Sequence, residues 1–218
     1  MTNTTSRSRA LLVQRLAGYG LIVSAEEVFT ATLAGAGVAR RAGYRVVAPF
    51  VPEPALVDLA GLELCGGTSG YPPTSAEAVL MGDLGEKWSY ALLQEAFEYL
   101  MSGAVLIALS RDRYWLRDGK LALDAGPFVA GLEFAVGKEA LVAGKPSAAF
   151  YKGALESMGL DPGKPVAMVG DDLWSDVQGA QRAGLMGWLV RTGKYRESVL
   201  AASGIVPDRI LDSVAALG

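Results

Sequence analysis

Residues 166–176 read Val-Ala-Met-Val-Gly-Asp-Asp-Leu-Trp-Ser-Asp, and they carry the clearest structural signal in the sequence. Four apolar residues form a candidate strand, a glycine lets the backbone turn sharply, and three carboxylates fall in and just after the connection to a helix-length segment. Such a connection lies at the carboxyl end of a strand, where open α/β sheets bind their ligands. The stretch therefore predicts an α/β protein whose functional site begins at Asp171.

The last part of the chain, about 80 residues, repeats this rhythm. Short apolar runs at 140–143, 166–169 and 187–190 alternate with helix-length segments. The alternation predicts βαβ units, with parallel strands and with helices on the faces of the sheet. Lys145 follows the run at 140–143, so we expect its ammonium at the same edge of the sheet as Asp171.

The N-terminal part of the chain also alternates helices with strands. A helix is expected at 6–19, with Gly20 as its left-handed C-terminal cap. Ser24 and Glu27 have the spacing of a capping box, which predicts that a second helix starts there and extends to residue 42. Further patterns predict strands at 45–49, 79–81 and 105–109, helices at 87–101 and 127–136, a loop-rich stretch at 62–75, and a hairpin that turns at Asp118-Gly119.

Composition excludes several classes of protein. The chain has 218 residues, 51% of them hydrophobic, and this is enough apolar material for a folded core. It has no histidine and one cysteine, Cys65, which excludes a Cys/His zinc site, a Ser-His-Asp triad and an internal disulfide. The formal charge of −3 provides no basic field for nucleic acid, and apolar runs stay well short of the ~20 residues that cross a membrane. Because the N-terminus has no secretory signal, we expect a cytoplasmic protein that binds neither nucleic acid nor membrane.

The acidic stretch has two interpretations. Asp171, Asp172 and Asp176 could supply the hard oxygen ligands that Mg²⁺ prefers, with water and a substrate phosphate in the open positions. The ammonium of Lys145 would then hold the carboxylates apart and pair with a phosphoryl group. Alternatively, Asp171 and Asp172 cap and solvate the start of a helix, Asp176 lies in its exposed first turn, and no metal binds. Lys145 would then be a solvated loop residue.

Two motifs favour the first interpretation. Gly144-Lys145-Pro146 follows a strand, and G-D-x-x-x-x-D at 170–176 precedes G-A-x-x-A-G at 179–184. Together they resemble the third and fourth motifs of phosphatases of the haloacid dehalogenase superfamily. The segments at 126–134 and 190–195 are similar to the subgroup that carries a large α/β cap, so the resemblance covers nearly the whole chain.

The resemblance implies a fold and a reaction. The fold is a Rossmann-like parallel-sheet core formed by residues 1–21 and 139–218, with an inserted α/β cap domain at 22–138 that selects the substrate. The reaction is Mg²⁺-dependent hydrolysis of a small phosphorylated molecule through an aspartyl-phosphate.

The resemblance also implies roles for individual residues. Thr2-Asn3 matches the second motif, so Thr2 and Asn3 are implied to bind the phosphate together with Lys145. Thr2 and Lys145 would be the catalytic groups. Among the carboxylates, Asp171 is implied as a metal ligand, Asp176 as a group just outside the ligand sphere, and Asp172 as a further candidate ligand.

The first motif of the superfamily belongs ahead of Thr2. Its aspartate attacks phosphorus in family members, and in this sequence only Met1 precedes Thr2. We therefore expect the first core strand to be absent from the sequence as written, its catalysis to be negligible, and a homo-oligomer to form at exposed strand edges. Two explanations stay open: a wrongly assigned start site, or a truncated relative that serves as a binding or interaction module.

Overall fold

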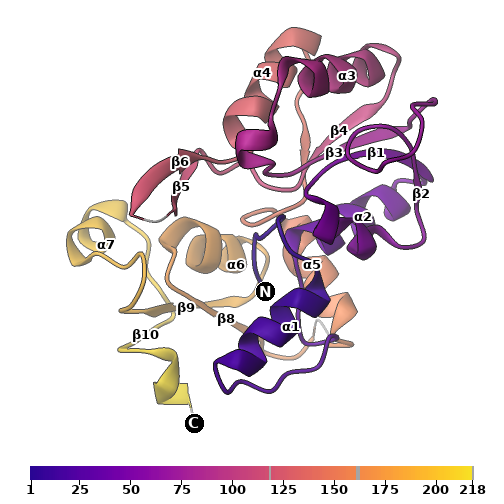
Figure 1. Cartoon of the computed structure of the whole chain (residues 1–218). Helices are drawn as coiled ribbons and strands as arrows, with labels where there is room; N and C mark the ends of the chain where they lie inside the picture. Colours follow the sequence, from indigo (N-terminus) through magenta and orange to yellow (C-terminus); the bar gives the residue numbers. More distant parts are fainter. Residues whose placement is uncertain (118, 161–162, 218) are drawn as a thin grey trace. The chain divides into compact units, whose positions relative to one another are not determined.

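The computed structural model describes residues 1–117, 119–160 and 163–217, and the chain divides into two compact units, Met1–Gly144 and Lys145–Gly218. Figure 1 shows the helices and strands of both units along the chain. Asp118, at the predicted hairpin turn, lies outside the described residues.

The first unit is built on a parallel sheet with the strand order β2-β1-β3-β4-β7. Its strands are β1 (Val46–Phe50), β2 (Glu63–Leu64), β3 (Ala78–Met81), β4 (Val105–Ala108) and β7 (Leu141–Val142). The predicted strands at 45–49, 79–81 and 105–109 are thus confirmed, and β2 is a short strand in the stretch that was expected to be a loop.

Helices cover both faces of this sheet (Figure 1). On one face, alternate strand residues such as Phe50 and Met81 form a common core with α3 (Tyr90–Met101) and α4 (Gly126–Val136). On the other face α2 (Ala31–Arg41) packs closely, since a Cβ added to Gly35 would lie 2.1 Å from a methyl carbon of Leu109. The apolar runs of the three central strands are buried on both faces, as expected of a covered parallel sheet.

The first unit also contains a helix and a hairpin outside the sheet. Helix α1 (Arg9–Gly18) lies within the predicted segment; the Ser8 side chain accepts a hydrogen bond from the Leu11 amide at its start, and Gly20 follows its end with φ of 81°. Strands β5 (Tyr114–Arg117) and β6 (Lys120–Leu123) pair as the predicted antiparallel hairpin. The described residues of the unit also include 3₁₀ segments at Glu53–Leu59 and Gly85–Lys87.

The predicted start of the second helix is wrong. Ser24 and Glu27 form half of a capping box, because the Ser24 amide donates to Oε2 of Glu27 at 2.8 Å, but residues 25–27 form only a turn. Helix α2 begins at Ala31, after Thr30, whose side chain accepts from the Leu33 amide. The chain is extended before this point because Thr2 and Thr30 form a parallel bridge and the Thr2 amide donates to the Phe29 carbonyl. This long-range pairing outweighs the local capping signal.

The second unit holds a smaller parallel sheet with the order β10-β9-β8. Leu173, Val177, Leu189 and Ile205 form one apolar cluster of this unit, and Phe150 and Tyr151 are also buried in it. The elements are α5 (Ala148–Ser157), β8 (Ala167–Gly170), a π-helical turn (Leu173–Gln178) that continues into α6 (Gly179–Arg182), β9 (Met186–Val190), α7 (Glu197–Ser203), β10 (Arg209–Leu211) and a 3₁₀ turn (Val214–Leu217).

The expectation that the strand before Lys145 shares a sheet with β8 is also wrong. That strand, β7, pairs in parallel with β4, and the Ala143 amide donates to the Ala108 carbonyl at 2.8 Å. The cause lies in the connection, because α4 carries the chain from β4 to β7 as a βαβ crossover, which places successive parallel strands side by side. An apolar run in the sequence predicts a strand but does not show which other strand it pairs with.

Both units nevertheless alternate helices with parallel strands, so the α/β class is confirmed. Within the described ranges, no helix combines the length and the apolarity that crossing a membrane requires.

Candidate active site

The predicted acidic stretch lies at the carboxyl end of β8, in the second unit. Gly170 ends this strand, and the side chain of Asp176 lies directly against its α-carbon. A Cβ added to Gly170 would be 2.2 Å from Oδ2 of Asp176, closer than any real contact. Glycine is therefore needed here to admit the carboxylate, in addition to allowing the turn.

Asp176 is the most buried of the three carboxylates and forms an ion pair with Lys145. The Lys145 ammonium donates to Oδ1 of Asp176 at 2.6 Å, and the two side chains are 10% and 6% exposed. The other oxygen, Oδ2, accepts from the Asp172 amide at 3.2 Å. Asp176 lies within the π-helical turn and not on an exposed helix surface. The structure thus brings Lys145 and Asp176 together, although β7 and β8 belong to different sheets.

Asp172 caps the π-helical turn. Its Oδ1 accepts from the amides of Trp174 and Ser175, at 3.0 and 2.9 Å. Its Oδ2 accepts from the ammonium of Lys194 at 2.8 Å. Burial acts to raise the pKa of Asp172, but the hydrogen bond from Lys194 and those from the two amides outweigh it and lower the pKa below the ordinary value. Asp172 is therefore held as a carboxylate at neutral pH.

Asp171 is held by the loop that follows β9. Its Oδ2 accepts from the backbone amide of Lys194 at 2.7 Å. The preceding residue, Gly193, has φ of +58°, and a Cβ added there would lie 2.0 Å from the same oxygen. The loop can approach the carboxylate this closely only because residue 193 is glycine.

Two residues of this site were missed by the analysis of the sequence. Lys194 contacts both Asp171 and Asp172, and the available signal was its position after β9, at the same sheet edge as Asp171. Tyr151, on α5, donates its phenolic hydrogen to the Ser175 carbonyl. Burial, followed by the negative charges of Asp176 and Asp172, raises the pKa of Tyr151, so the phenol stays protonated as a donor. No local pattern indicated this contact.

Thr2 and Asn3 belong to the first unit. The Thr2 hydroxyl contacts the Thr4 hydroxyl at 3.1 Å and accepts from the Thr4 amide at 3.2 Å, so the segment forms a compact turn. Thr5 anchors the turn to the end of β3, because its hydroxyl accepts from the Asp83 amide at 2.9 Å. A Cβ added to Gly144 would lie 3.1 Å from Oδ1 of Asn3, so this side chain contacts the last residue of its unit.

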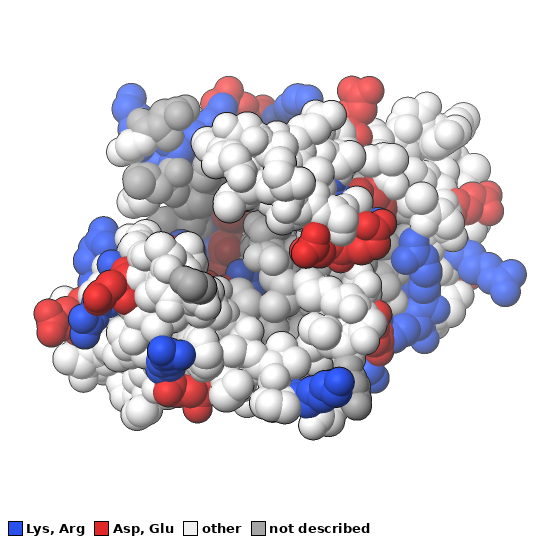
Figure 2. Space-filling model, turned by 90° about the horizontal axis from the view of Figure 1, so that it is seen from below, with Lys and Arg blue, Asp and Glu red and all other residues white. Residues whose placement is uncertain are grey.

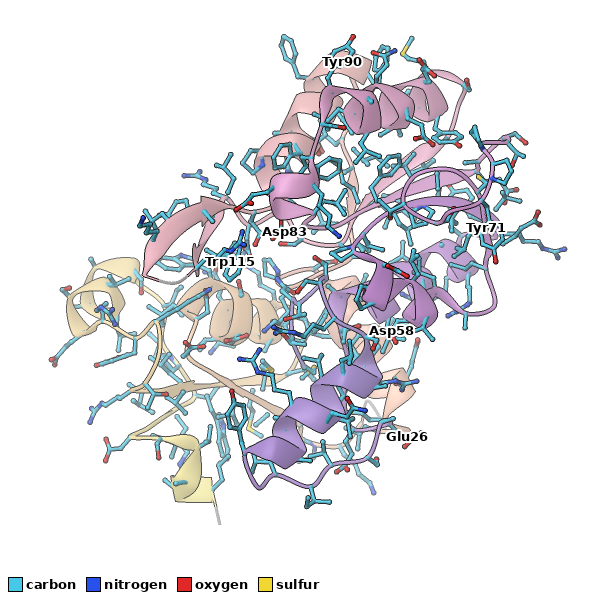
Figure 3. The ribbon with its side chains drawn as sticks, in the orientation of Figure 1. Glu26, Asp58, Tyr71, Asp83, Tyr90 and Trp115 are labelled. Atoms are coloured by element: carbon cyan, nitrogen blue, oxygen red, sulfur yellow. The ribbon has the colours of Figure 1, made fainter. Side chains whose placement is uncertain are left out.

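The first unit also gathers carboxylates near this turn. Asp83, labelled in Figure 3, follows β3, while Asp112 and Asp124 flank the hairpin on which Trp115 lies. Burial is the main cause that raises the pKa of Asp124, and the charges of Asp83 and Asp112 add to it, to about 6. Hydrogen bonds from the Ala125 amide and from Ser110 oppose the shift without cancelling it.

Asp124→Asn is expected to raise the free energy of unfolding at pH 7.5 by about 1–2 kcal/mol, allowing for solvent screening of a partly exposed group. In the wild type the folded pKa of about 6 exceeds the unfolded pKa, about 4. The proton on Asp124 therefore stabilises the fold fully below about pH 4, and this contribution is lost as the pH rises through 6.

Urea unfolding of wild type and Asp124→Asn at pH 4.5 and 7.5 measures this effect. Glu139→Gln, a change at an exposed loop residue, is the control and should leave the free energy of unfolding unchanged at both pH values. The gain in free energy of unfolding of Asp124→Asn over wild type should be much larger at pH 7.5 than at pH 4.5. An equal gain at both pH values would mean that titration of Asp124 is not its source.

The carboxylates of the second unit fit a magnesium ion of the kind that phosphoryl-transfer sites use. Among the described residues, no group of three or more Asp, Glu, Cys or His side chains gathers closely enough to hold a metal ion alone. Mg²⁺ commonly takes one or two carboxylates and completes its coordination with water and substrate phosphate. Asp172 and Asp176 each have both oxygens in hydrogen bonds, which leaves Asp171 as the best candidate ligand.

Charge on the visible face of the molecule is mixed. Figure 2 shows Lys and Arg side chains interspersed with Asp and Glu and separated by uncharged residues on that face. On this face an anionic substrate would be attracted by individual cations and not by a broad basic surface.

Comparisons with known proteins place these features in a family. The HAD-hydrolase-like family matches residues 142–217. Haloacid dehalogenase-like hydrolase domain-containing protein 2 of Homo sapiens is 39% identical over 198 residues, which are 91% of this chain and 72% of that protein.

Two solved structures have the same fold. The p-nitrophenyl phosphatase from Archaeoglobus fulgidus has a TM-score of 0.85 and 30% identity, covering 97% of this chain and 81% of that one. Glycerol phosphate phosphatase Rv1692 from Mycobacterium tuberculosis, solved in complex with magnesium, has a TM-score of 0.84 and 26% identity, covering 99% of this chain and 65% of that one.

Proposed function

Because the chain belongs to the haloacid dehalogenase-like hydrolases, we propose that it is a Mg²⁺-dependent phosphatase that acts on a small phosphorylated molecule through an aspartyl-phosphate. The family predicted from the motifs at 144–146 and 170–184 is confirmed. Both solved structures compared above carry phosphatase names, and one of them contains magnesium.

The observation that carries the proposal is the buried pair of Lys145 and Asp176. A lysine that is 10% exposed and fixed by a carboxylate at 2.6 Å is costly to bury, so an ordinary loop residue would not occupy this position. We infer that Asp176 positions the ammonium to bind a phosphoryl oxygen and to stabilise the charge that develops during transfer. Asp176 itself stays outside the ligand sphere, since both its oxygens are already engaged.

We assign the metal ligand to Asp171, with Asp172 as a second candidate. Mg²⁺, when bound, would neutralise charge on the phosphoryl oxygens. The protein's contribution is to hold Asp171 at the end of β8 through the Lys194 amide. Asp172 is kept ionised by its two amide donors and by Lys194.

Thr2 and Asn3 complete the proposed phosphate contacts, with Thr2 as a catalytic donor through its hydroxyl. The turn that they form is anchored at the end of β3 by Thr5, which gives the hydroxyl a defined position in its unit. We further propose that 1–21 and 139–218 form the catalytic core and that 22–138 form the cap that selects the substrate. The parallel sheet of the first unit lies mainly within this cap range.

Hydrolysis of p-nitrophenyl phosphate tests the proposal. Rates would be measured with Mg²⁺ and with excess EDTA, for residues 1–218 and for a form extended upstream by the codons that precede Met1 in the gene. We expect turnover by the extended form, its loss in EDTA and its return when Mg²⁺ is added back. If Mg²⁺ changes the rate of neither form, the chain is better explained as the binding or interaction module.

A further inference from the structure

Two lysines contact the carboxylates at the end of β8, and their environments differ. The Lys145–Asp176 pair is almost completely buried, with side chains 10% and 6% exposed. In the Lys194–Asp172 pair the carboxylate is 17% exposed but the lysine is 67% exposed. Exposed ion pairs contribute little free energy and exchange readily with solvent. Lys145 is therefore a fixed part of the site, whereas the ammonium of Lys194 can leave at low cost.

Two contacts of Lys194 reach these carboxylates. Its backbone amide donates to Asp171, and its ammonium donates to Asp172. The first contact depends on the loop and on Gly193, so it would persist with any ordinary side chain at position 194. The second depends on the ammonium alone. That ammonium is a cation placed on one of two adjacent carboxylates, which repel each other when neither is neutralised.

We propose that the Lys194 ammonium is a resident counter-ion of the Asp171–Asp172 pair, which a divalent cation displaces when it binds. The inference rests on the proposed function, in which this pair takes Mg²⁺. In the absence of metal, Lys194 neutralises Asp172. When a cation binds at Asp171, the ammonium moves into solvent and Oδ2 of Asp172 becomes free to contact the ion or its water. Lys194 thus weakens metal binding, through competition for Asp172 and through charge repulsion.

A purely structural role for Lys194 predicts the opposite effect. If its ammonium were needed to place the carboxylates, removing it would weaken metal binding. The carboxylates have other anchors, however. Trp174 and Ser175 hold Asp172 through their amides, and the amide of residue 194 holds Asp171. Removing only the ammonium should leave both in place and make them more available to the ion.

Calorimetric titration of the protein with MgCl₂ distinguishes the two roles. Lys194→Met is expected to bind Mg²⁺ roughly tenfold more tightly than wild type, because one positive charge is removed near the ion. Lys194→Gln should behave in the same way, and Lys194→Arg, which keeps the charge, should stay within about twofold of wild type. Lys152→Met, which removes an exposed lysine of α5 in the same unit, is the matched control and should leave the affinity unchanged.

Thermal unfolding provides a second readout that does not depend on activity. Without metal, Lys194→Met should melt close to wild type, because the exposed ion pair contributes little. Its melting temperature should rise more than that of wild type on addition of Mg²⁺. Equal or weaker Mg²⁺ binding by both Lys194→Met and Lys194→Gln, with intact circular dichroism, would overturn the inference. Tighter binding by these variants without p-nitrophenyl phosphate turnover would support the inference and contradict the proposed function. Binding of Mg²⁺ by none of the proteins would contradict both.

Discussion

Replacing Asp176 with alanine is expected to lower the free energy of unfolding by about 3–5 kcal/mol, because the Lys145 ammonium would stay in a buried position without this carboxylate. A charge taken out of water is costly, and here the carboxylate at 2.6 Å offsets much of that cost. The variant also loses the acceptor for the Asp172 amide and leaves a cavity against Gly170.

Urea unfolding monitored by circular dichroism measures this effect. Asp212→Ala is the matched control, because Asp212 is a carboxylate of the same unit whose side chain is 88% exposed, and its removal should cost less than about 0.5 kcal/mol. The double variant Lys145→Met, Asp176→Ala should be more stable than Asp176→Ala alone, since no charge is then left buried. A double variant that is no more stable than the single one would show that the buried charge does not explain the loss.

Much of the fold could be predicted from local patterns. The strand, glycine and carboxylate order at 166–176 predicted β8 and its connection, and Gly20 and Pro127 marked helix ends that the structure contains. These signals succeed because they depend on backbone geometry within a few residues. Pairings between strands that are far apart in the sequence were harder to predict. The position of α2 depends on the pairing of Thr2 with Thr30, and that of β7 depends on its crossover from β4.

In the candidate site, too, some residues could be predicted from local patterns and others could not. Asp171, Asp172, Asp176 and Lys145 could be selected from sequence, because their motifs combine an unusual charge pattern with strand ends. Tyr151 could not, since nothing within a few residues of it indicates a contact with residues 171–176. The signal for Lys194 was weak, because it consisted only of its position after β9, at the same sheet edge as Asp171. The sequence also does not reveal that Gly170 and Gly193 are required by close contacts with carboxylates as well as by turns.

Asp171→Ala is expected to lower kcat/KM for p-nitrophenyl phosphate by about 10²–10³-fold, the effect of removing one group that stabilises transition-state charge. Asp171 is the carboxylate whose oxygens are least engaged by the protein, so it is the group through which the site would hold Mg²⁺. The free energy of unfolding should change little, because Asp171 accepts its hydrogen bond from the Lys194 amide in a loop where water can replace the carboxylate.

The role of Asp171 as the metal ligand of a phosphatase is tested by the Mg²⁺ dependence of kcat/KM. The measurement compares Asp171→Ala with wild type and Asp212→Ala, in the form of the protein that turns over p-nitrophenyl phosphate. We predict that Asp212→Ala follows the wild-type curve and that Asp171→Ala stays at least about a hundredfold below it at every Mg²⁺ concentration. An Asp171→Ala curve within about threefold of wild type, at the same half-saturating Mg²⁺ concentration, would contradict the assignment of this carboxylate as the metal ligand of a phosphatase.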